Sequence, residues 1–390
     1  MVKRKMVKLC DMFTLQMGKT PSRDNSAYWN GTHKWVSIAD LGKATKIIVD
    51  TKECITDLAV SETGIKATPK DTVVMSFKLS IGKTAVTAEE IYTNEAIMSF
   101  IDKGIYDFDI DYIYHLFSGK DWSEGTNKAV MGVTLNKATL SQIIIPLPPI
   151  EEQQKIAHNL GKVTNLIEVC NAILEKLDLL VKSRFVEMFG NFVYDKDRWS
   201  KCLVGDVAGT VDPQPSHRTP PVEANGIPYI GIAECNYQTR TIDFASARKV
   251  GNNVLQEHIA RYNLHIGDFI IGKIGTIGKP FFVPAERTYA LSANTVLIQP
   301  DTKRIAPYYL FSIFQSEYMD RIIDAEKKST SQPAFGIQKV RAIEIPLPPL
   351  ALQEQFAAFV EQTDKSKLAV KQVLEKAEML KKALMQEYFG

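Results

Sequence analysis

The chain contains two near-copies of one segment, and the distance between the copies is the feature that most limits its architecture. Residues 145–190 and 345–390 both begin Ile-Pro-Leu-Pro-Pro and both end Phe-Gly. Aligned without a gap, they share 15 identities in 46 positions, including Leu-Glu-Lys at 174–176 and 374–376. A repeat of 200 residues is too long for a solenoid, whose units have about 20–50 residues. It indicates two copies of a whole module, and two modules suit a target that itself has two parts.

Composition and charge limit the classes of protein to which the chain can belong. A hydrophobic content of 45% and a charged content of 24% are ordinary for a globular protein in water. The sequence has no run of about 18 apolar residues, so no membrane span is predicted. Its first residues do not resemble a signal peptide. Five scattered cysteines without a Cys-x-x-Cys pair favour a reducing cytosol over a disulfide framework or a zinc site. The net charge of +2 argues against strong unaided binding to a polyanion, so nucleic-acid contacts should come from local basic loops or be helped by a partner.

The repeated segments predict two long helices. Each proline-rich leader fixes an extended approach, and the acidic Glu151 and Glu152 that follow suit the positive end of a helix dipole. Gly190 and Gly390 stand where a helix commonly ends in a left-handed residue. Each helix would have roughly 38 residues and a length of ~55–60 Å. Gly161 is expected to kink or break the first helix near its start.

Apolar residues in both helices follow alternating steps of four and three, the spacing of a coiled-coil seam. Arg184 breaks the apolar series in the first copy, and Thr363, Lys367 and Lys381 are weaker positions in the second. Because so narrow a stripe covers only one seam, an antiparallel pair within the chain is favoured over helices in the core of a large bundle. The predicted seam comprises Ile156, Leu160, Val163, Ile167, Cys170, Leu174, Leu177, Val181 and Met188 in the first copy and Phe356, Val360, Val370, Leu374, Ala377, Leu384 and Tyr388 in the second.

The segments outside the helices also match one another in order, at slightly varying offsets. Such drift is what small loop insertions produce, so the two modules should share one fold. The matches are Pro21-Ser22-Arg23 with Pro215-Ser216-His217 and 35–40 with 229–234 at an offset of 194, 70–74 with 267–271 at 197, 80–83 with 276–279 at 196, and Asn94 with Asn294 at 200.

The shared fold is predicted to be mixed α/β. Aromatic residues at helical spacing predict helices at 109–117 and 307–318. Short apolar runs bounded by Gly, Pro and Asp predict strands at 35–39, 72–77, 228–232, 268–272, 281–283 and 295–299.

Motifs that carry catalysis are missing from the sequence. The Gly-Lys-Thr triplets at 18–20 and 82–84 lack the earlier glycine of a P-loop, and no dinucleotide fingerprint follows a strand. No Asn-Pro-Pro or Asp-Pro-Pro motif of amino-methylating enzymes occurs, and the six histidines show no metal-ligand spacing. Asp301 with Glu326 and the two lysines after it is the best match to a metal-dependent nuclease, but such coincidences are common. We therefore expect no catalysis, no cofactor and no metal on this chain.

Taken together, these features resemble a known family. A loop with Ile-Gly-Lys, an Asn-containing strand and then Ile-Pro-Leu-Pro-Pro leading into a long helix, all present twice, is similar to the specificity (S) subunit of type I restriction-modification systems. The resemblance covers the whole chain, and the repeated leader with its coiled coil is its specific part. It implies two similar mixed α/β target-recognition domains, at 1–145 and 191–345, joined by two conserved helices, at 146–190 and 346–390. These helices would form an antiparallel coiled coil, which gives a pseudo-twofold tandem repeat.

The resemblance also implies a function and partners. Such a protein reads a split double-stranded DNA target with one half-site per domain, and it recruits two adenine-N6 methyltransferase (modification) subunits and then restriction (motor and nuclease) subunits. S-adenosylmethionine and the flipping of the target adenine would belong to the modification subunits. The implied setting is the prokaryotic cytoplasm. The alternatives are a coiled-coil scaffold with two protein-binding heads, a nuclease built on Asp301 and Glu326, and a regulatory S-like protein that reads no DNA.

Direct readout of bases uses mainly Arg, Lys, Asn and Gln, with Ser and Thr as helpers. Lys83 and Lys279 are expected to contact phosphate, because glycine beside a cation allows close backbone approach. Tyr28, Trp29 and Trp122 offer stacking surfaces, although such aromatics more often fill a core. At each position a solvated loop residue is the competing interpretation. The candidates are Lys19, Ser22, Arg23, Lys78, Ser80, Lys83, Lys120, Asn127 and Lys128 in the first module and Ser216, His217, Arg218, Lys273, Thr276, Lys279, Lys327, Lys328, Ser329, Thr330, Ser331 and Gln332 in the second.

Overall fold

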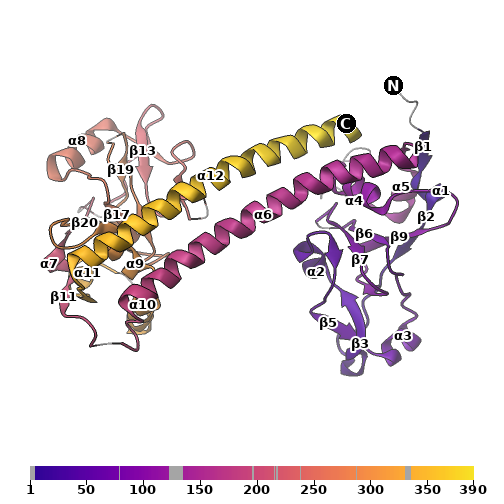
Figure 1. Ribbon diagram of the computed structural model, residues 1–390, viewed down its shortest axis with the longest axis horizontal. Helices are drawn as coiled ribbons and strands as arrows, with labels where there is room; N and C mark the ends of the chain where they lie inside the picture. Colours follow the sequence, from indigo (N-terminus) through magenta and orange to yellow (C-terminus); the bar gives the residue numbers. More distant parts are fainter. Residues whose placement is uncertain are drawn as a thin grey trace. The chain divides into compact units, whose positions relative to one another are not determined.

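The chain forms two compact units, each made of one module and parts of both long helices. Unit 1 comprises Met1–Asn171 with Lys371–Gly390, and unit 2 comprises Ala172–Val370 (Figure 1). The boundaries of the units therefore fall inside the two helices. The computed structural model describes residues 5–78, 80–122, 135–195, 197–214, 216, 218–237, 239–286, 288–329 and 335–390, without the side chains of 328 and 329.

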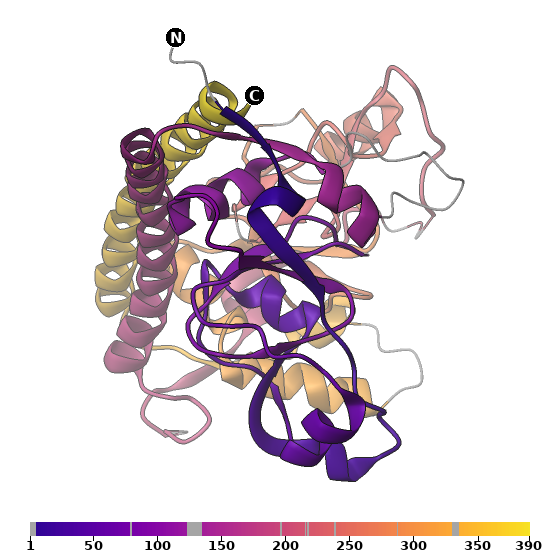
Figure 2. The same ribbon diagram turned by 90° about the vertical axis from the view of Figure 1, so that its right-hand side faces the viewer.

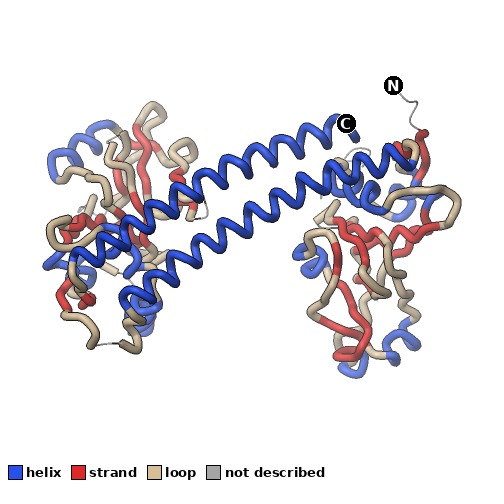
Figure 3. Tube along the Cα trace, viewed as in Figure 1, coloured by secondary structure: helices blue, strands red, loops and turns tan. Residues whose placement is uncertain are grey.

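Unit 1 contains a five-stranded sheet, a three-stranded sheet and a small leader sheet (Figure 3). The five-stranded sheet has the order β2-β9-β6-β7-β4, the three-stranded sheet has the order β5-β3-β8, and β1 pairs with β10. The strands are β1 (Lys5–Lys8), β2 (Phe13–Met17), β3 (Trp29–Val36), β4 (Ile47–Ile48), β5 (Glu53–Ile55), β6 (Val73–Ser76), β7 (Thr84–Thr87), β8 (Tyr92–Thr93), β9 (Ile97–Asp102) and β10 (Ile144–Leu147). The helices of the module are α1 (Leu9–Met12), η1 (Ser26–Tyr28), α2 (Ile38–Lys43), α3 (Asp57–Thr63), α4 (Ile110–Gly119) and α5 (Lys137–Gln142).

Unit 2 repeats this plan. Its four-stranded sheet has the order β12-β20-β17-β18, its three-stranded sheet has the order β16-β13-β19, and β11 pairs with β21. The strands are β11 (Lys201–Leu203), β12 (Ala208–Val211), β13 (Ile227–Ile230), β14 (Cys235–Asn236), β15 (Thr241–Ile242), β16 (Lys249–Val250), β17 (Phe269–Gly272), β18 (Pro280–Phe282), β19 (Ala290–Leu291), β20 (Thr295–Pro300) and β21 (Glu344–Pro346). The helices of the module are α7 (Val204–Val207), α8 (Asn252–Arg261), α9 (Pro307–Phe314), α10 (Glu317–Ser329) and α11 (Ile337–Arg341). Two similar mixed α/β domains are therefore confirmed.

Hydrogen bonds fix which residues of the two modules are equivalent, and they correct one predicted match. The Asn94 N–H donates to the Val36 carbonyl across 3.0 Å, and the Ser292 N–H donates to the Ile230 carbonyl across 2.7 Å. Ser292, and not Asn294, is therefore the counterpart of Asn94. The predicted match was two residues too far along the chain, because asparagine is present at both 94 and 294.

A second match moves by one residue. Asp71 and Gly267 both have a left-handed backbone, with φ of 54° and 96°. Asp71 thus corresponds to Gly267 at an offset of 196, not to Asp268 at 197. Because a positive φ suits glycine better than aspartate, the backbone is kept here while the residue type changes.

Two predicted elements end earlier than expected. The strand predicted at 35–39 stops at Val36, because Ser37 and Asp40 form a capping box that starts α2 at Ile38. The helix predicted at 307–318 is divided at Gln315 into α9 and α10, and the Ser316 hydroxyl donates to the Ile313 carbonyl at the break. Local side-chain bonds to the backbone thus override the apolar spacing.

The repeated segments form helices α6 (Ile150–Phe189) and α12 (Leu350–Phe389), each of 40 residues. Helix α6 continues through Gly161, so the predicted break there is wrong. Gly190 follows α6 with φ of 86°, as a left-handed cap requires. All the predicted seam positions, including the polar Arg184, Thr363, Lys367 and Lys381, are buried or half-buried.

Within each unit the two helices lie side by side and run in opposite directions (Figures 1 and 2). In unit 1, Asn159 near the start of α6 donates to the Tyr388 hydroxyl near the end of α12 across 3.2 Å. In unit 2, the rings of Phe185 and Phe356 meet at 5.4 Å between centroids. The antiparallel helix pair predicted from the sequence is confirmed.

A buried glutamine joins each long helix to its module in the same way. Gln153 is 1% exposed; its amide donates to the Pro148 carbonyl across 2.8 Å, and its oxygen accepts from the Asp109 N–H across 3.0 Å. Gln353 is fully buried and makes the equivalent bonds, at 2.8 Å to Pro348 and 2.9 Å from Ala306. In each unit the glutamine thus connects the proline-rich leader to the N-cap residue of α4 or α9, and this shared role explains why it is identical in both repeats. Among the described helices, none is long and apolar enough to cross a membrane.

Candidate nucleic-acid interface

Each unit presents a turn between two antiparallel strands, and the two turns are alike where they lead into the second strand. In unit 1, β6 and β7 enclose residues 77–83; in unit 2, β17 and β18 enclose residues 273–279. Gly82 and Gly278 have φ of 89° and 75° and donate to the carbonyls of Ser76 and Gly272 across 2.9 and 3.1 Å. The two Ile-Gly-Lys motifs are therefore equivalent in structure as well as in sequence.

The exposed part of each turn carries a hydroxyl residue and a lysine. Ser80 and Lys83 are exposed in unit 1, as are Thr276 and Lys279 in unit 2. Lys78 is half-buried, with its ammonium group 5.3 Å from the centroid of the Phe77 ring. Small polar residues next to a cation suit contact with a sugar-phosphate backbone.

Lys273 differs from its predicted role. Its side chain is only 10% exposed, and its ammonium group donates to Asp212 Oδ2 across 2.8 Å and to the Ala293 carbonyl across 3.2 Å. A buried lysine requires such partners. Lys273 therefore holds the start of the turn in place and is not a surface contact.

In the predicted loop of Lys19, Ser22 and Arg23 all three residues are exposed, but the Lys19 ammonium group donates to the Thr63 carbonyl and the arginine is also engaged. The Arg23 guanidinium forms a two-pronged ion pair with the Glu53 carboxylate and lies 3.8 Å from the centroid of the Trp29 ring. The hydrogen bond from Arg23 lowers the pKa of Glu53, and the same bond raises the pKa of Arg23. Arg23 is thus a fixed, oriented donor rather than a mobile one.

The corresponding loop of unit 2 is polar and exposed. The Ser216 hydroxyl accepts from Gln214 Nε2 across 3.0 Å and from the Arg218 N–H across 3.4 Å, and Arg218 is exposed. His217 lies outside the described residues.

The remaining candidates lie near the ends of helices. Lys120 is half-buried after α4, and Lys327 is exposed on α10, where it pairs with Asp324 at 3.3 Å. Lys328 and Ser329 belong to the last turn of α10, but their side chains are not described. Asn127, Lys128, Thr330, Ser331 and Gln332 lie outside the described residues.

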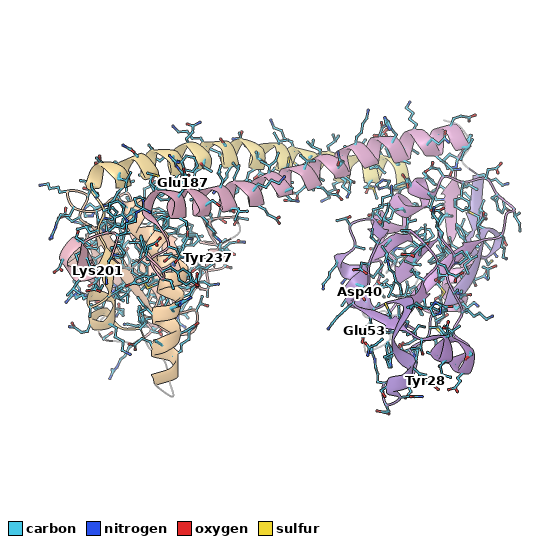
Figure 4. The ribbon with its side chains drawn as sticks, turned by 60° about the horizontal axis from the view of Figure 1, so that its bottom comes forward. Tyr28, Asp40, Glu53, Glu187, Lys201 and Tyr237 are labelled. Carbon is cyan, nitrogen blue, oxygen red and sulfur yellow. The ribbon has the colours of Figure 1, made fainter. Side chains whose placement is uncertain are left out.

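The three candidate aromatic residues have different environments. Trp122 is 4% exposed and its indole donates to the Phe117 carbonyl across 2.8 Å, so it fills the core. Trp29 is half-buried beneath Arg23, and the hydroxyl of the half-buried Tyr28 donates to Glu62 across 2.7 Å. Figure 4 labels Tyr28 together with Asp40 and Glu53 in unit 1.

A polar cleft in unit 2 was missed by the sequence reasoning. Its volume is about 340 Å³, and it lies where β13 and β19 end beside the turn at 273–279. The Ile-Gly-Lys motif marks the turn itself, whereas the cleft depends on loops far apart in sequence. Its lining includes Thr219, Tyr229, Glu234, Arg248, Thr276 and Asn294.

The proposed nuclease pattern gains no support from the geometry. Glu326 is ion-paired with Lys339, and Asp301 Oδ1 accepts from the Lys303 N–H across 3.1 Å. Within the described ranges, no group of three or more His, Cys, Asp and Glu side chains is placed to hold a metal ion.

This fold defines a class of protein in which one mixed α/β domain occurs twice in tandem and each copy is followed by a long helix. A family model described as the type I restriction modification DNA specificity domain matches residues 1–179 and again residues 187–379. The chain therefore belongs to this family.

Named relatives and solved structures agree with this assignment. The chain is 34% identical over 220 residues to the type I restriction enzyme MjaIX specificity subunit of Methanocaldococcus jannaschii, covering 51% of this chain and 50% of the relative. It is 21% identical over 277 residues to the EcoBI specificity subunit of Escherichia coli, covering 64% and 58%. The matches thus span between half and three-fifths of these relatives.

The fold resembles the S subunit of a type I restriction-modification system from M. genitalium, with a TM-score of 0.60, 14% identity and coverage of 100% of this chain and 97% of that one. A second structure, from a study of complex assembly and conformational transition of a type I system, gives a TM-score of 0.58, 16% identity and coverage of 98% and 96%. At these identities the likeness establishes the fold.

Proposed function

We propose that this chain is the non-catalytic DNA-specificity subunit of a type I restriction-modification complex. Each unit would read one half-site of a split double-stranded target. The observation that carries the proposal is the duplication itself: two domains of similar topology present equivalent turns, with exposed Lys83 in one and Lys279 in the other. Two readers on shared helices require half-sites at a constant gap.

The helices also support the proposal that the chain recruits modification subunits. Apart from its seam, α6 carries exposed apolar residues in both units: Leu166 and Val169 in unit 1, and Ile173 and Leu180 in unit 2, each 39–48% exposed. A step of three residues in the first pair and of seven in the second places each pair on one face of its part of the helix. Exposed apolar residues at such spacing mark a docking face for another helix, and α12 carries exposed Leu368, Val373, Met379 and Leu380.

Two modification subunits would follow from the duplication, one for each repeat, and restriction subunits would join them. Methylation of adenine, S-adenosylmethionine binding and base flipping would be the work of the modification subunits. The near-neutral charge of +2 supports a shared role in holding DNA, because the partners would supply much of the phosphate contact.

The test is to co-express the chain with a type I modification subunit in a methylation-free bacterial host and to map N6-methyladenine across the genome by single-molecule sequencing. We expect one split motif with a constant gap. Association of the subunits without new methylation would contradict the reading of DNA.

A regulatory S-like protein or scaffold is the second candidate. It is favoured by one observation: Arg23 and Lys273 are both neutralised by carboxylates of their own unit. A band-shift assay on bulk DNA, with and without the modification subunit, separates the two. Binding of the chain to DNA that the modification subunit strengthens supports the DNA-specificity subunit. Binding of the chain to the modification subunit that DNA leaves unchanged supports the scaffold.

A further inference from the structure

One position of the shared scaffold carries opposite charges in the two units. Trp35 of β3 is paired with Glu53 of β5, and β3 runs parallel to β8 at Trp35. In unit 2 the equivalent Tyr229 donates its N–H to the Arg248 carbonyl across 2.8 Å, and β13 runs parallel to β19 at Tyr229. Glu53 and Arg248 are therefore structural counterparts.

Each counterpart sits in a mixed-charge setting. In unit 1, Glu53 holds Arg23 over Trp29. In unit 2, Arg248 and Glu234 both line the polar cleft. Arg248 Nη2 donates to the Pro220 carbonyl across 2.6 Å, and Glu234 Oε2 accepts from the Gly231 N–H across 2.8 Å. Within the described part of unit 2, one bond to the backbone thus orients each charged group, and the rest of its hydrogen-bonding capacity is available to a ligand.

The chemistry of the cleft distinguishes a base edge from a phosphate. An arginine donates in pairs to guanine O6 and N7, and a carboxylate accepts from cytosine N4. A carboxylate in the same cleft as the arginine repels a phosphate, which is itself an anion. A concave site that carries both charges therefore fits the major-groove edge of a G·C pair better than the DNA backbone.

We propose that Arg248, with Glu234, reads a G·C base pair in the half-site of unit 2, and that Arg23, braced by Glu53, is the corresponding reader in unit 1. This inference rests on the proposed function. Exposed Asn294 and Thr276 at the rim of the cleft are placed to contact the neighbouring base pair. The opposite charges at positions 53 and 248 give one scaffold two different recognition surfaces, as two unlike half-sites require.

The test uses the full chain with its modification subunit and the genome-wide methylation map. In Arg248→Gln we expect the motif to become degenerate at one G·C position of one half-site, with discrimination lowered roughly 10- to 100-fold. The gap and the other half-site should stay unchanged. Arg23→Gln should relax the other half-site instead.

Glu234→Gln is the second variant, because its amide oxygen can still accept from Gly231 while its charge is lost. It should relax the same base pair as Arg248→Gln. Lys249→Gln, the exposed neighbour on β16, is the control for loss of a positive charge and should leave the motif intact.

An unchanged motif in both Arg248→Gln and Glu234→Gln would overturn the inference, as would a uniform loss of methylation at all sites by folded variants. If the unaltered chain gives no split motif, the proposed function fails instead, so the two failures are distinct.

Discussion

The guanidinium group of Arg240 donates to the carboxylate of Asp364 across 2.7 Å. Arg240 also reaches Asp178 at 3.0 Å, so the turn after β14 is bonded to both α6 and α12 within unit 2. Buried Lys367 completes the cluster, at 2.7 Å from Asp178 and 3.4 Å from Asp364. Polar groups in an apolar seam can fix the register of paired helices, and this cluster is placed to do so.

Lys367 should tolerate an apolar replacement better than truncation. Its side chain is 6% exposed. Both variants remove the ammonium group and leave Asp178 and Asp364 paired with Arg240, but Lys367→Ala also leaves a void where the aliphatic stem was packed. We expect a loss of about 2–3 kcal/mol in unfolding free energy for Lys367→Ala, whereas Lys367→Met fills most of that space and should stay within about 1 kcal/mol of the parent. Urea titration, with hydrogen exchange of residues 360–370 as the signal, measures the unfolding free energy of both variants. Equal losses for the two variants would contradict the prediction.

Acid should destabilise unit 1 through His115. Burial, followed by the charges of Lys381 and Lys46, lowers the pKa of His115 from 6.5 to about 4. The unfolded chain therefore binds a proton below pH 6.5 that the folded chain refuses until about pH 4, so stability is complete above 6.5 and falls through this window. Between pH 7.5 and 5.0 the loss is about 2 kcal/mol.

The measurement is urea unfolding at both pH values in a Trp199→Phe background, because the other three tryptophans, Trp29, Trp35 and Trp122, belong to unit 1. His115→Phe is the control and should remove about 2 kcal/mol of the pH dependence. If the control keeps the full pH dependence, other groups cause it.

The turn of unit 2 should reject a side chain at Gly272. A Cβ there would lie 1.9 Å from the Thr276 carbonyl oxygen, whereas Gly275, with φ of 76°, has open space around the same atom. We expect Gly272→Ala to cost more than about 2 kcal/mol, and Gly275→Ala about 1 kcal/mol from backbone strain. Thermal unfolding and competition for specific DNA would rank the two variants by their loss of stability and of binding. A larger loss in Gly275→Ala than in Gly272→Ala would contradict the prediction.

Two exposed cations should have different effects on DNA binding. Lys279→Ala should weaken binding similarly for all sequences and reduce the salt-dependence slope by about 1, as loss of one phosphate contact does. Arg218→Ala should relax one half-site. Competition binding of the complex over a salt series measures both. Sequence-selective loss in Lys279→Ala would mean that this lysine contacts a base.

The sequence was sufficient where the contacts that form an element are local. Four-three spacing gave the seam of α6 and α12, and the repeated Ile-Gly-Lys gave the two turns. Gly161 did not break α6, because the packed face of the helix outweighs the weak propensity of one glycine. Element ends were harder to place, since the Ser37–Asp40 box competes with strand pairing over only a few residues.

The site was less accessible, because long-range pairing decides which charges are free. Asp212 lies 61 residues from Lys273, and Glu53 lies 30 residues from Arg23. Neither distance produces a pattern in the sequence. The glutamine at 153 and 353 was visible as an identity, but its role depends on carbonyl and N–H groups whose positions only the folded backbone reveals.

Unit 1 is assembled from two stretches of chain, and the second of them is synthesised only after all of unit 2. At about 5–20 residues per second, roughly 10–40 s separate the two stretches during translation. Until Lys371–Gly390 is made, Tyr112 lacks Phe389, whose ring lies 5.6 Å away in the finished unit. Unit 1 is therefore completed only after unit 2, although its first stretch precedes unit 2 in the chain. In that interval the face of unit 1 that later packs against the end of α12 is uncovered. A chaperone can bind this face, or the matching helix of a neighbouring nascent chain can occupy it, which is a route to domain-swapped dimers.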